Sequence, residues 1–562
     1  MSRYINNITY ILKMYRYKID SSYEKIPLEL NIIKAPLNKQ GFADLLSINL
    51  EYTCKLNRAK NRINDYSSTV WEEVKKHTNP YEFIYAFNTK HKGNDYRSVS
   101  MIKPLSRSFF KMIEMIHEFC PHILNEDTIK SKEKDYQKNR KKNKQIMFED
   151  NNNNDNYNDN DNDNDNDNDD NKNKDNNDDN DDNNNKDNND DNDDNETHLN
   201  GTSALIPLLI SVHIAEGPGG FIEAVRFVRK GKYDDHAFGM TLIDNKYNNN
   251  ETRDCFLKKP YQNKAVHEFE TFKNKGARGA EALALKPLAL KPLVPGWKQS
   301  NHFLLNNPEV HIINGVDGTG DIYKPENIYF LNNKMRDFGE CSREGSKECS
   351  REGSKGREGS KECSRKGSGA HLITADGGFD FSVEYNYQEQ SSCKLIFSQI
   401  LAAIKCQRIG GTFICKFFDI NLYFTVEMLY LLYSVYETVT IYKPFTSRIA
   451  NSEKYIICSN FRGIDSVLCE TLFDVLNQWN KYNFETINQL FKEIPSLFIE
   501  RLKEINIEIV DTQISSINNA INIIKKQKFI TNSYVYSSEM TVDKQIKYAK
   551  DWCKLYNIPY KY

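Results

Sequence analysis

Three ionisable residues fall where predicted strands begin or end, the positions from which an open sheet presents side chains to a ligand. Asp376 closes the run HLITAD, Lys416 lies inside the apolar run FICKFF, and Glu453 precedes the run KYIICSN. A lysine flanked by isoleucine, cysteine and phenylalanine is costly to bury without a partner, so we expect Asp376 and Glu453 to be its partners. A structural ion-pair cluster is the alternative, because such clusters shift ionisation without doing chemistry.

A glycine-rich turn, Glu216 to Phe221 (EGPGGF), follows the first predicted strand. Glycines there let the backbone approach a ligand closely, although a tight strand-to-helix turn without a ligand is the alternative. The turn lacks the full G-x-G-x-x-G spacing and contains Pro218, which favours a compact cofactor over one with a pyrophosphate. The run DGTGD, which ends at Asp321, follows the third predicted strand. The carboxylate of Asp321 could accept a hydrogen bond from a ribose hydroxyl or an adenine amine, or it could serve only the backbone of the turn.

The elements that must position these residues alternate between apolar runs and helical spacing. The expected strands are residues 208–216, 237–244, 310–316, 371–376, 411–418, 438–443 and 454–460, with helices at 221–229, 384–409 and 422–436. This rhythm predicts an α/β fold with a mostly parallel, doubly wound sheet. The last two strands are joined by a short loop and can pair only antiparallel.

The 562 residues are enough for two or three domains, but part of the chain cannot build a core. We expect low-complexity insertions at residues 130–200, 247–295 and 338–369. They interrupt one domain at 76–463, which lies between an N-terminal helical extension, 1–75, and a C-terminal helical region, 464–562. Since the Asn/Asp block holds many of the 78 acids that oppose 76 lysines and arginines, the rest is basic and suits an anionic partner.

Some classes of protein are not expected. No apolar run reaches the roughly 18 residues of a membrane span. Charges at Arg3, Lys13, Arg16 and Lys18 break up a signal-peptide core. The 12 cysteines show no paired metal spacing, and they indicate neither a disulfide framework nor a zinc site.

Longer motifs in the same order carry a family resemblance. They are RSFFKMIEM, AEGPGGF, FGMTL, DGTGDI, PENI, ADGGF, GGTFICKFFD and KPFTSRIANSEKYIICS. Over about Cys54 to Gly463, without the insertions, the chain resembles the FtsJ-like RNA 2'-O-methyltransferases, and among them the cap-specific mRNA nucleoside 2'-O-methyltransferases of the cap 1 type. The upstream run NPYE at 79–82 is similar to an element of the cap 1 enzymes that is not general to FtsJ proteins.

The resemblance implies a Rossmann-like methyltransferase fold with a seven-stranded sheet and a catalytic tetrad of Lys111, Asp376, Lys416 and Glu453. It implies S-adenosylmethionine as cofactor, with contacts from Glu216, Gly217, Pro218, Gly219, Gly220, Phe221, Asp321 and Asp376. Lys416 is the candidate general base, and we expect Lys111 and the apolar strand to lower its pKa. No metal is required by this scheme. Candidate contacts to RNA are Lys55, Lys75 and Arg448, for which ordinary surface cations are the alternative.

The implied reaction is methyl transfer to the ribose 2'-hydroxyl of the first transcribed nucleotide of capped mRNA. Expected partners are the capped mRNA 5' end and the transcription or capping machinery, without a membrane, and the expected location is the nucleus, with the cytoplasm as second choice. A methyltransferase acting on ribosomal or transfer RNA is one alternative, which NPYE disfavours, and a non-catalytic RNA-binding scaffold is another, which the tetrad disfavours. One departure from the family is the pair Asp380 and Phe381 after ADGGF, in a region that contributes to the cap pocket of relatives.

Overall fold

The computed structural model describes residues 16–19, 30–33, 47–85, 89–91, 94–96, 98–124, 208–229, 235–243, 297, 300–344, 369–379, 385–482, 489–526 and 542–561. All of these residues belong to one compact unit. The expected insertions at 130–200 and 247–295 lie outside the described residues, as do residues 345–368 of the third.

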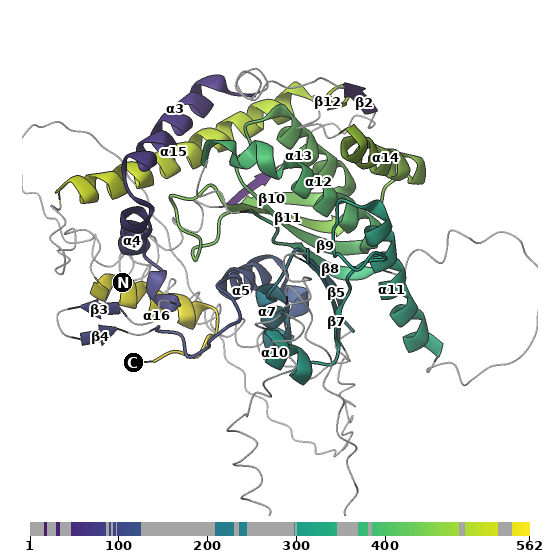
Figure 1. Cartoon of the computed structure of the whole chain (residues 1–562), viewed down its shortest axis with the longest axis horizontal. Coiled ribbons are helices and arrows are strands. Elements are labelled where there is room, and N and C mark those ends of the chain that lie inside the picture. Colours follow the sequence, from purple (N-terminus) through teal and green to yellow (C-terminus); the bar gives the residue numbers. More distant parts are fainter. Residues whose placement is uncertain are drawn as a thin grey trace, which may run out of the picture. The chain divides into compact units, whose positions relative to one another are not determined.

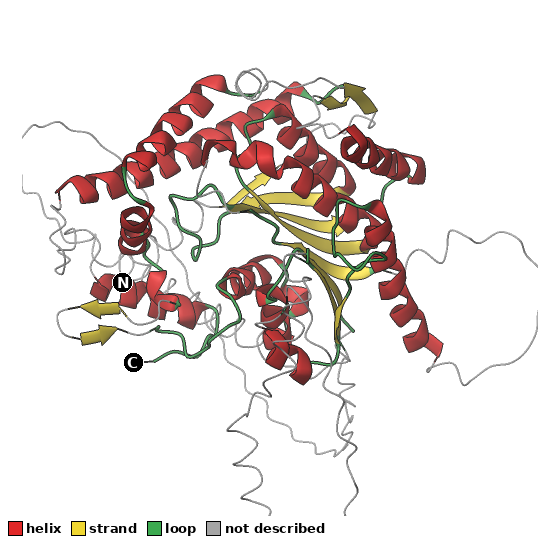
Figure 2. Cartoon of the chain, viewed as in Figure 1, coloured by secondary structure: helices red, strands yellow, loops and turns green. Residues whose placement is uncertain are grey.

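A mixed eight-stranded sheet forms the centre of this unit (Figures 1 and 2). Its strands, in order across the sheet, are β1 (Arg16–Ile19), β10 (Tyr436–Tyr442), β11 (Lys454–Phe461), β9 (Gln407–Phe417), β8 (Ala370–Ala375), β5 (Ile210–Ile214), β6 (His236–Met240) and β7 (Val310–Ile312). The strands from β9 to β7 pair in parallel, whereas β11 pairs antiparallel with both β9 and β10. The prediction of a mostly parallel sheet with an antiparallel strand is therefore confirmed.

The predicted number of seven strands is wrong by one, because β1 adds an eighth strand at the edge. β1 comes from the region that was expected to be helical, and it pairs antiparallel with β10. In the run RYKI, charged Arg16 and Lys18 alternate with Tyr17 and buried Ile19. Such alternation with exposed charges is typical of an edge strand, and it is too short to stand out in the sequence.

Helices cover both faces of the sheet (Figure 1), and the strands alternate between the two cores. Phe413 and Cys415 of β9 join the core beneath α12 (Gln388–Cys406) and α13 (Tyr423–Val435), which we call the α12 face. Ile414 of β9 joins the core beneath α5 (Ser108–Phe119) and α7 (Gly220–Arg229), which we call the α5 face. Consecutive residues of one strand thus serve different faces.

The terminal regions pack onto the same unit. Helices α3 (Leu50–Asn61) and α4 (Ser68–Thr78) share a small core with α15 (Ser496–Lys526). Helix α16 (Val542–Leu555) joins the core of the α5 face, and α14 (Ser466–Tyr482) joins that of the α12 face. The C-terminal region is not purely helical, because β12 (Gln489–Phe491) pairs with β2 (Leu30–Ile33).

The remaining elements are one long helix that packs on the α12 face, α11 (Pro325–Glu344), and several short ones. The short ones are α10 (Asn301–Asn306), the hairpin of β3 (Thr89–His91) and β4 (Asn94–Tyr96), and the helices η1 (Arg62–Asp65), η2 (Glu82–Ile84), η3 (Pro121–Ile123) and η7 (Tyr385–Tyr387). Helix α11 continues to Glu344, inside the stretch expected as an insertion from 338, because Arg343 and the glutamates Glu340 and Glu344 are good helix formers. None of the described helices is long and apolar enough to span a membrane.

Candidate active site

The register of the sheet brings Asp376, Lys416 and Glu453 to one edge. Ala375 of β8 pairs with Cys415 of β9, so the residues that follow, Asp376 and Lys416, are neighbours. Because β11 runs antiparallel, it begins beside the end of β9, and Glu453 directly precedes its first residue. The carboxyl edge of the parallel strands, where open α/β sheets bind ligands, therefore holds three of the four predicted catalytic residues.

Lys111 completes the predicted tetrad from α5. Its Nζ lies 2.7 Å from Glu453 Oε1 and 2.9 Å from Oε2, so both carboxylate oxygens accept from one ammonium. Lys416 Nζ donates to the backbone oxygen of Asp376 at 2.7 Å and lies 3.3 Å from Asp376 Oδ1. The structure thus assembles the tetrad as two Lys-carboxylate pairs, and each of the four side chains keeps between 12% and 17% exposure.

The charges in this cluster shift its ionisation. Burial opposes the ionised form of Glu453, but Lys111, Lys416 and Lys443 outweigh it and hold the pKa of Glu453 well below its usual range. Burial likewise opposes the ammonium of Lys416, but the carboxylates of Asp376, Glu453 and Glu216 raise the pKa of Lys416 above its ordinary value. The expectation of a lowered Lys416 pKa is therefore wrong, because the attraction of the carboxylates exceeds the effect of burial.

Glu216 stands beside the tetrad at the end of β5. Its Oε1 accepts the backbone N–H of Phe221 at 2.5 Å, and Oε2 is buried without a hydrogen-bond partner among the described residues. Burial and the nearby charge of Asp376 raise the pKa of Glu216 well above its usual value. A buried carboxyl group with an unused oxygen at a ligand-binding edge is suited to receive a cation.

The turn from Glu216 to Phe221 has the close approach that its glycines predicted. Gly219 has a φ of 107°, and a Cβ there would come within 2.9 Å of the ring of Trp297. Gly378, in the motif ADGGF, leaves room for Lys416, whose Nζ would lie 3.0 Å from an added Cβ. Side chains at either position would crowd the groups that border the site.

Asp321 lies in the loop after β7, and the structure does not join it to the tetrad by any described contact. Its Oδ1 accepts the backbone N–H of Tyr323 at 2.9 Å, which is a turn role. The loop that carries Asp321 contacts the segment after β6, since the N–H of Ile243 donates to the oxygen of Thr319 at 2.8 Å. Asp321 therefore borders the same carboxyl edge of the sheet, two strands away from Glu216.

The structure brings two of the three predicted RNA contacts together and places the third apart from them. Lys75 is buried and pairs with Glu72, and the same carboxylate lies 3.3 Å from Arg448. Arg448 also pairs with Glu82 of the NPYE run at 2.9 Å, which ties this run to the loop that leads to Glu453. Lys55, in contrast, lies exposed on α3 and pairs with Glu51, and no described contact joins it to the other two.

Some functional candidates were not predicted. The Tyr455 hydroxyl donates to Asp376 Oδ1 at 2.8 Å, and the Ser447 hydroxyl donates to Glu453 Oε1 at 2.8 Å. Tyr455 follows Glu453 by two residues along a strand, a spacing that places both on one face and could have indicated it. Ser447 lies in a loop and had no comparable signal. The departure at Asp380 and Phe381 lies outside the described residues.

Comparison with known proteins agrees with this geometry. Residues 294–461 match the FtsJ-like methyltransferase family. The mouse cap-specific mRNA (nucleoside-2'-O-)-methyltransferase 1 is 29% identical over 355 residues, which cover 63% of this chain and 33% of that protein. The protein of the same name from Trypanosoma brucei brucei is 39% identical over 150 residues, 26% of this chain and 32% of its own.

The chain thus matches about a third of the length of these relatives. A solved ribosomal RNA methyltransferase from Plasmodium falciparum covers 46% of this chain and 88% of its own, at 16% identity and a TM-score of 0.24, too low to support an argument. The family match includes Asp376, Lys416 and Glu453, which the sheet register brings together. Residues 294–461 of this chain are therefore similar to the FtsJ-like methyltransferases.

Proposed function

We propose that this protein transfers a methyl group from S-adenosylmethionine to the ribose 2'-hydroxyl of the first transcribed nucleotide of capped mRNA. The observation that supports it most is the assembly of Lys111, Asp376, Lys416 and Glu453 at the carboxyl edge of the sheet. The similarity to cap-specific relatives favours capped mRNA over other RNA substrates.

The residues present fit the cofactor. Glu216, whose buried Oε2 has no partner among the described residues, and Asp376 offer negative charge to a cationic ligand, and the turn from Gly217 to Phe221 brings backbone close to it. Asp321, at the same edge, is the proposed acceptor for a ribose hydroxyl. When bound, S-adenosylmethionine supplies a methyl group that its sulfonium has already activated.

Lys416 is the proposed base. A ribose hydroxyl is a poor nucleophile near neutral pH, so the protein must orient it and remove its proton as the oxygen–methyl bond forms and the sulfur–methyl bond breaks. The proton passes to Lys416 Nζ, which must first be a neutral amine. Positive charge held beside Glu216 and Asp376 would offset the carboxylates that raise the pKa of Lys416.

The other tetrad members have supporting roles. Glu453 holds Lys111 through two charge-assisted hydrogen bonds, and Lys111 in turn directs an ammonium toward the reacting oxygen. Asp376 fixes Lys416, and the Tyr455 hydroxyl fixes Asp376. Arg448 and Lys75 are the proposed contacts to the phosphates of the RNA 5' end. Lys55 is the proposed contact to a phosphate farther along the RNA.

The test is methyl transfer from labelled S-adenosylmethionine to two RNAs of identical sequence, one capped and one with a 5' triphosphate. We expect transfer to the capped RNA and little or none to the other at every salt concentration, because base stacking on the cap is much less salt-dependent than phosphate contacts. Equal transfer to both would favour a ribosomal or transfer RNA substrate. Binding of capped RNA without transfer would favour a non-catalytic scaffold.

A further inference from the structure

The two halves of the Lys111–Glu453 pair come from segments 342 residues apart in the chain. Lys111 lies on α5, whereas Glu453 ends the loop of residues 444–453 between β10 and β11, which we call the catalytic loop. An ion pair of this kind has useful geometry only if helix and loop are held in register by other contacts. The groups that hold them are therefore part of how the site works.

Glu114 is the group that joins them directly. It lies on α5, three residues after Lys111, and it has no exposed surface. Glu114 Oε2 accepts the backbone N–H of Phe445 at 2.7 Å and the Tyr442 hydroxyl at 3.1 Å. Glu114 Oε1 accepts the backbone N–H of Thr446 at 2.9 Å. A helix residue one turn from Lys111 thus holds the start of the catalytic loop.

The fourth donor comes from the end of the described chain. Trp552 of α16 donates its indole Nε1–H to Glu114 Oε1 at 2.9 Å. The same helix fixes the NPYE run, since Gln545 Nε2 donates to the backbone oxygens of Asn79 at 2.7 Å and Lys76 at 2.9 Å. Helix α16 therefore braces both α5 and the segment that pairs with Arg448.

Four hydrogen-bond donors surround the buried carboxyl group of Glu114 and fix its orientation. Only a carboxylate accepts from all four at once, because a protonated oxygen would itself be a donor. Burial raises the pKa of Glu114 to about 7, so the hydrogen bonds offset a real desolvation cost. A buried, costly and fully used acceptor at this junction indicates a requirement for defined geometry.

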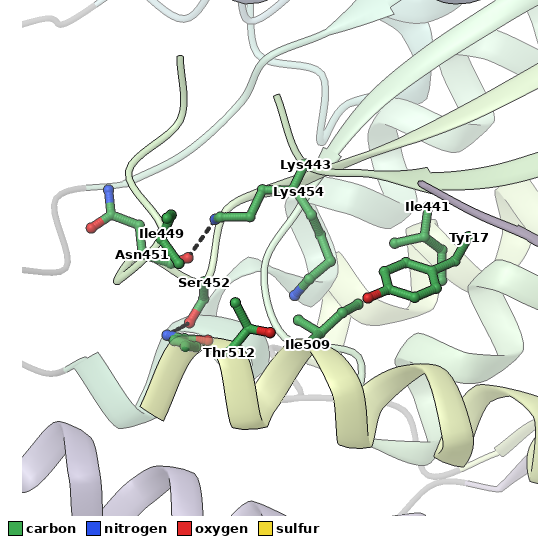
Figure 3. A pocket seen from close by; sticks show the side chains of 10 residues that line it. Tyr17, Ile441, Lys443, Ile449, Asn451, Ser452, Lys454, Ile509 and Thr512 are labelled. Atoms are coloured by element: carbon green, nitrogen blue, oxygen red, sulfur yellow. Dashed lines mark hydrogen bonds between the residues drawn. The ribbon is translucent and has the colours of Figure 1, made fainter. Parts of the chain in front are cut away.

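The second half of the catalytic loop is held by groups from α15 and the end of β10. Lys443 Nζ donates to the backbone oxygens of Asn451 at 2.6 Å and Glu453 at 2.7 Å, and Figure 3 shows its side chain reaching Asn451. Gln513 of α15 donates to Ala450 O and Ser452 Oγ, each at 3.1 Å. Since these contacts fix the end of the loop, the hydrogen bonds of Glu114 are what tie its start to the helix of Lys111.

We propose that Glu114 is a positioning residue for methyl transfer, which sets α5 against the catalytic loop so that Lys111 meets Glu453, and that Trp552 completes its hydrogen bonding. This inference rests on the proposed function. It assigns Glu114 no contact with cofactor or RNA. Its loss should therefore change turnover and the order of the loop more than cofactor binding.

The test compares Glu114→Gln with a matched control, Glu427→Gln. Glu427 is also a buried carboxyl group on a helix, and it accepts the backbone N–H groups of Leu490 and Phe491, but it lies on the α12 face. Each glutamine keeps the shape and turns one acceptor into a donor that faces N–H groups. The measurements are kcat, KM, the cofactor Kd by calorimetry, and amide hydrogen exchange of residues 444–453.

For Glu114→Gln we expect exchange at Phe445 and Thr446 to rise by about tenfold or more and kcat to fall about 10–100-fold, with the cofactor Kd within about twofold of wild type. Glu427→Gln should leave these amides and kcat unchanged. If the glutamine variant does not fold, Trp552→Phe, which removes a single donor, should show the same pattern at about a 3–10-fold loss of kcat.

Unchanged kcat in Glu114→Gln with faster exchange would overturn the positioning role. Equal losses in Glu114→Gln and Glu427→Gln would do so as well, because they would indicate general destabilisation. A wild-type protein that methylates no RNA would contradict the proposed function alone. In that case the amide hydrogen exchange of the catalytic loop decides whether Glu114 holds the loop. Faster exchange in Glu114→Gln but not in Glu427→Gln would support this link, and equal exchange in the two variants would overturn it.

Discussion

Two buried clusters of lysines and carboxylates lie on opposite sides of the same sheet. The tetrad lies on the α5 face, and a second cluster of Lys60, Asp419, Lys454 and Glu389 lies on the α12 face. Adjacent residues, Glu453 and Lys454, supply one member to each, because successive residues of β11 point to opposite faces. Two clusters of the same residue types thus lie on opposite faces of the sheet, and neighbouring residues of the chain belong to different clusters.

The two clusters differ in exposure and in unused hydrogen-bonding capacity. The side chains of Lys60 and Asp419 are 3% and 9% exposed and their pair is 2.6 Å long. Glu389 Oε1 accepts the N–H groups of Asn421 and Leu422, and Lys454 donates to the oxygen of Phe418. The tetrad side chains are 12–17% exposed, and the neighbouring Glu216 has one oxygen without a partner in the part of the chain that the structure describes.

The comparison separates a structural ion network from a reactive one. A closed, satisfied network holds elements together, here α3 against the end of β9, whereas an open one with spare acceptors can exchange charge with a ligand. Residue type alone does not distinguish them. The predictions below therefore pair changes in one cluster with changes in the other.

The largest expected effect is from Lys416→Ala. If Lys416 takes the proton, turnover should fall by about 10²–10⁴-fold while the cofactor still binds, since general bases contribute about this much. Single-turnover methyl transfer and calorimetry measure the two quantities. A variant that keeps more than roughly a tenth of the rate would remove Lys416 from the role of base.

On the α12 face, Lys60→Met should act on stability instead. It leaves Asp419 buried without its closest cation, which we expect to lower the free energy of unfolding by about 3 kcal/mol. Urea unfolding measures this, and kcat per cofactor-binding site should stay within about twofold of wild type. A loss of turnover without a loss of stability would show that the two clusters are not functionally distinct.

Glu216→Gln should weaken cofactor binding by about tenfold or more, because it removes the charge that a cationic ligand would meet. The raised pKa of Glu216 also predicts the direction of the pH dependence of cofactor affinity. At a pH below this pKa the carboxyl group of the free protein is neutral, so the affinity of the wild type should rise with pH through the pKa and then level off. Calorimetry across this pH range checks both statements. The glutamine variant should lose the rise, and a rise that persists would assign it to another group.

The smallest effect is expected at Lys55, which belongs to neither cluster. Lys55→Glu should reduce the salt dependence of RNA binding by about one phosphate contact and raise KM more than it lowers kcat. Arg448 belongs to the catalytic loop and its side chain is buried, so Arg448→Ala serves as the comparison and should lower both kcat and affinity. Binding titrations at several salt concentrations test this, and an unchanged slope would exclude Lys55 from the RNA path.

Local patterns in the sequence were enough to predict much of the fold and site. Strand ends and spacing located Asp376, Lys416 and Glu453, and apolar runs located the parallel strands, because these features depend on neighbouring residues. The family resemblance added Lys111, whose place over the sheet no local pattern indicates. Its contact with Glu453 confirms that the two lie together.

What could not be predicted depends on contacts between distant segments. The edge strand β1 forms only because β10 offers it a partner. The direction in which the Lys416 pKa shifts depends on whether the attraction of three carboxylates, which lie at the ends of different strands, outweighs burial. That balance can be worked out only when their distances from Lys416 are known. The role of Glu114 requires Trp552, a residue 438 positions away.

The most direct test of the central proposal is methyl transfer to capped RNA whose first nucleotide carries 2'-deoxyribose, compared with the same RNA carrying ribose there. The proposed reaction needs that single hydroxyl as nucleophile, so we predict full transfer to the ribose form and none above background to the deoxyribose form. Equal transfer to both RNAs would place the methyl group elsewhere and contradict the proposed function.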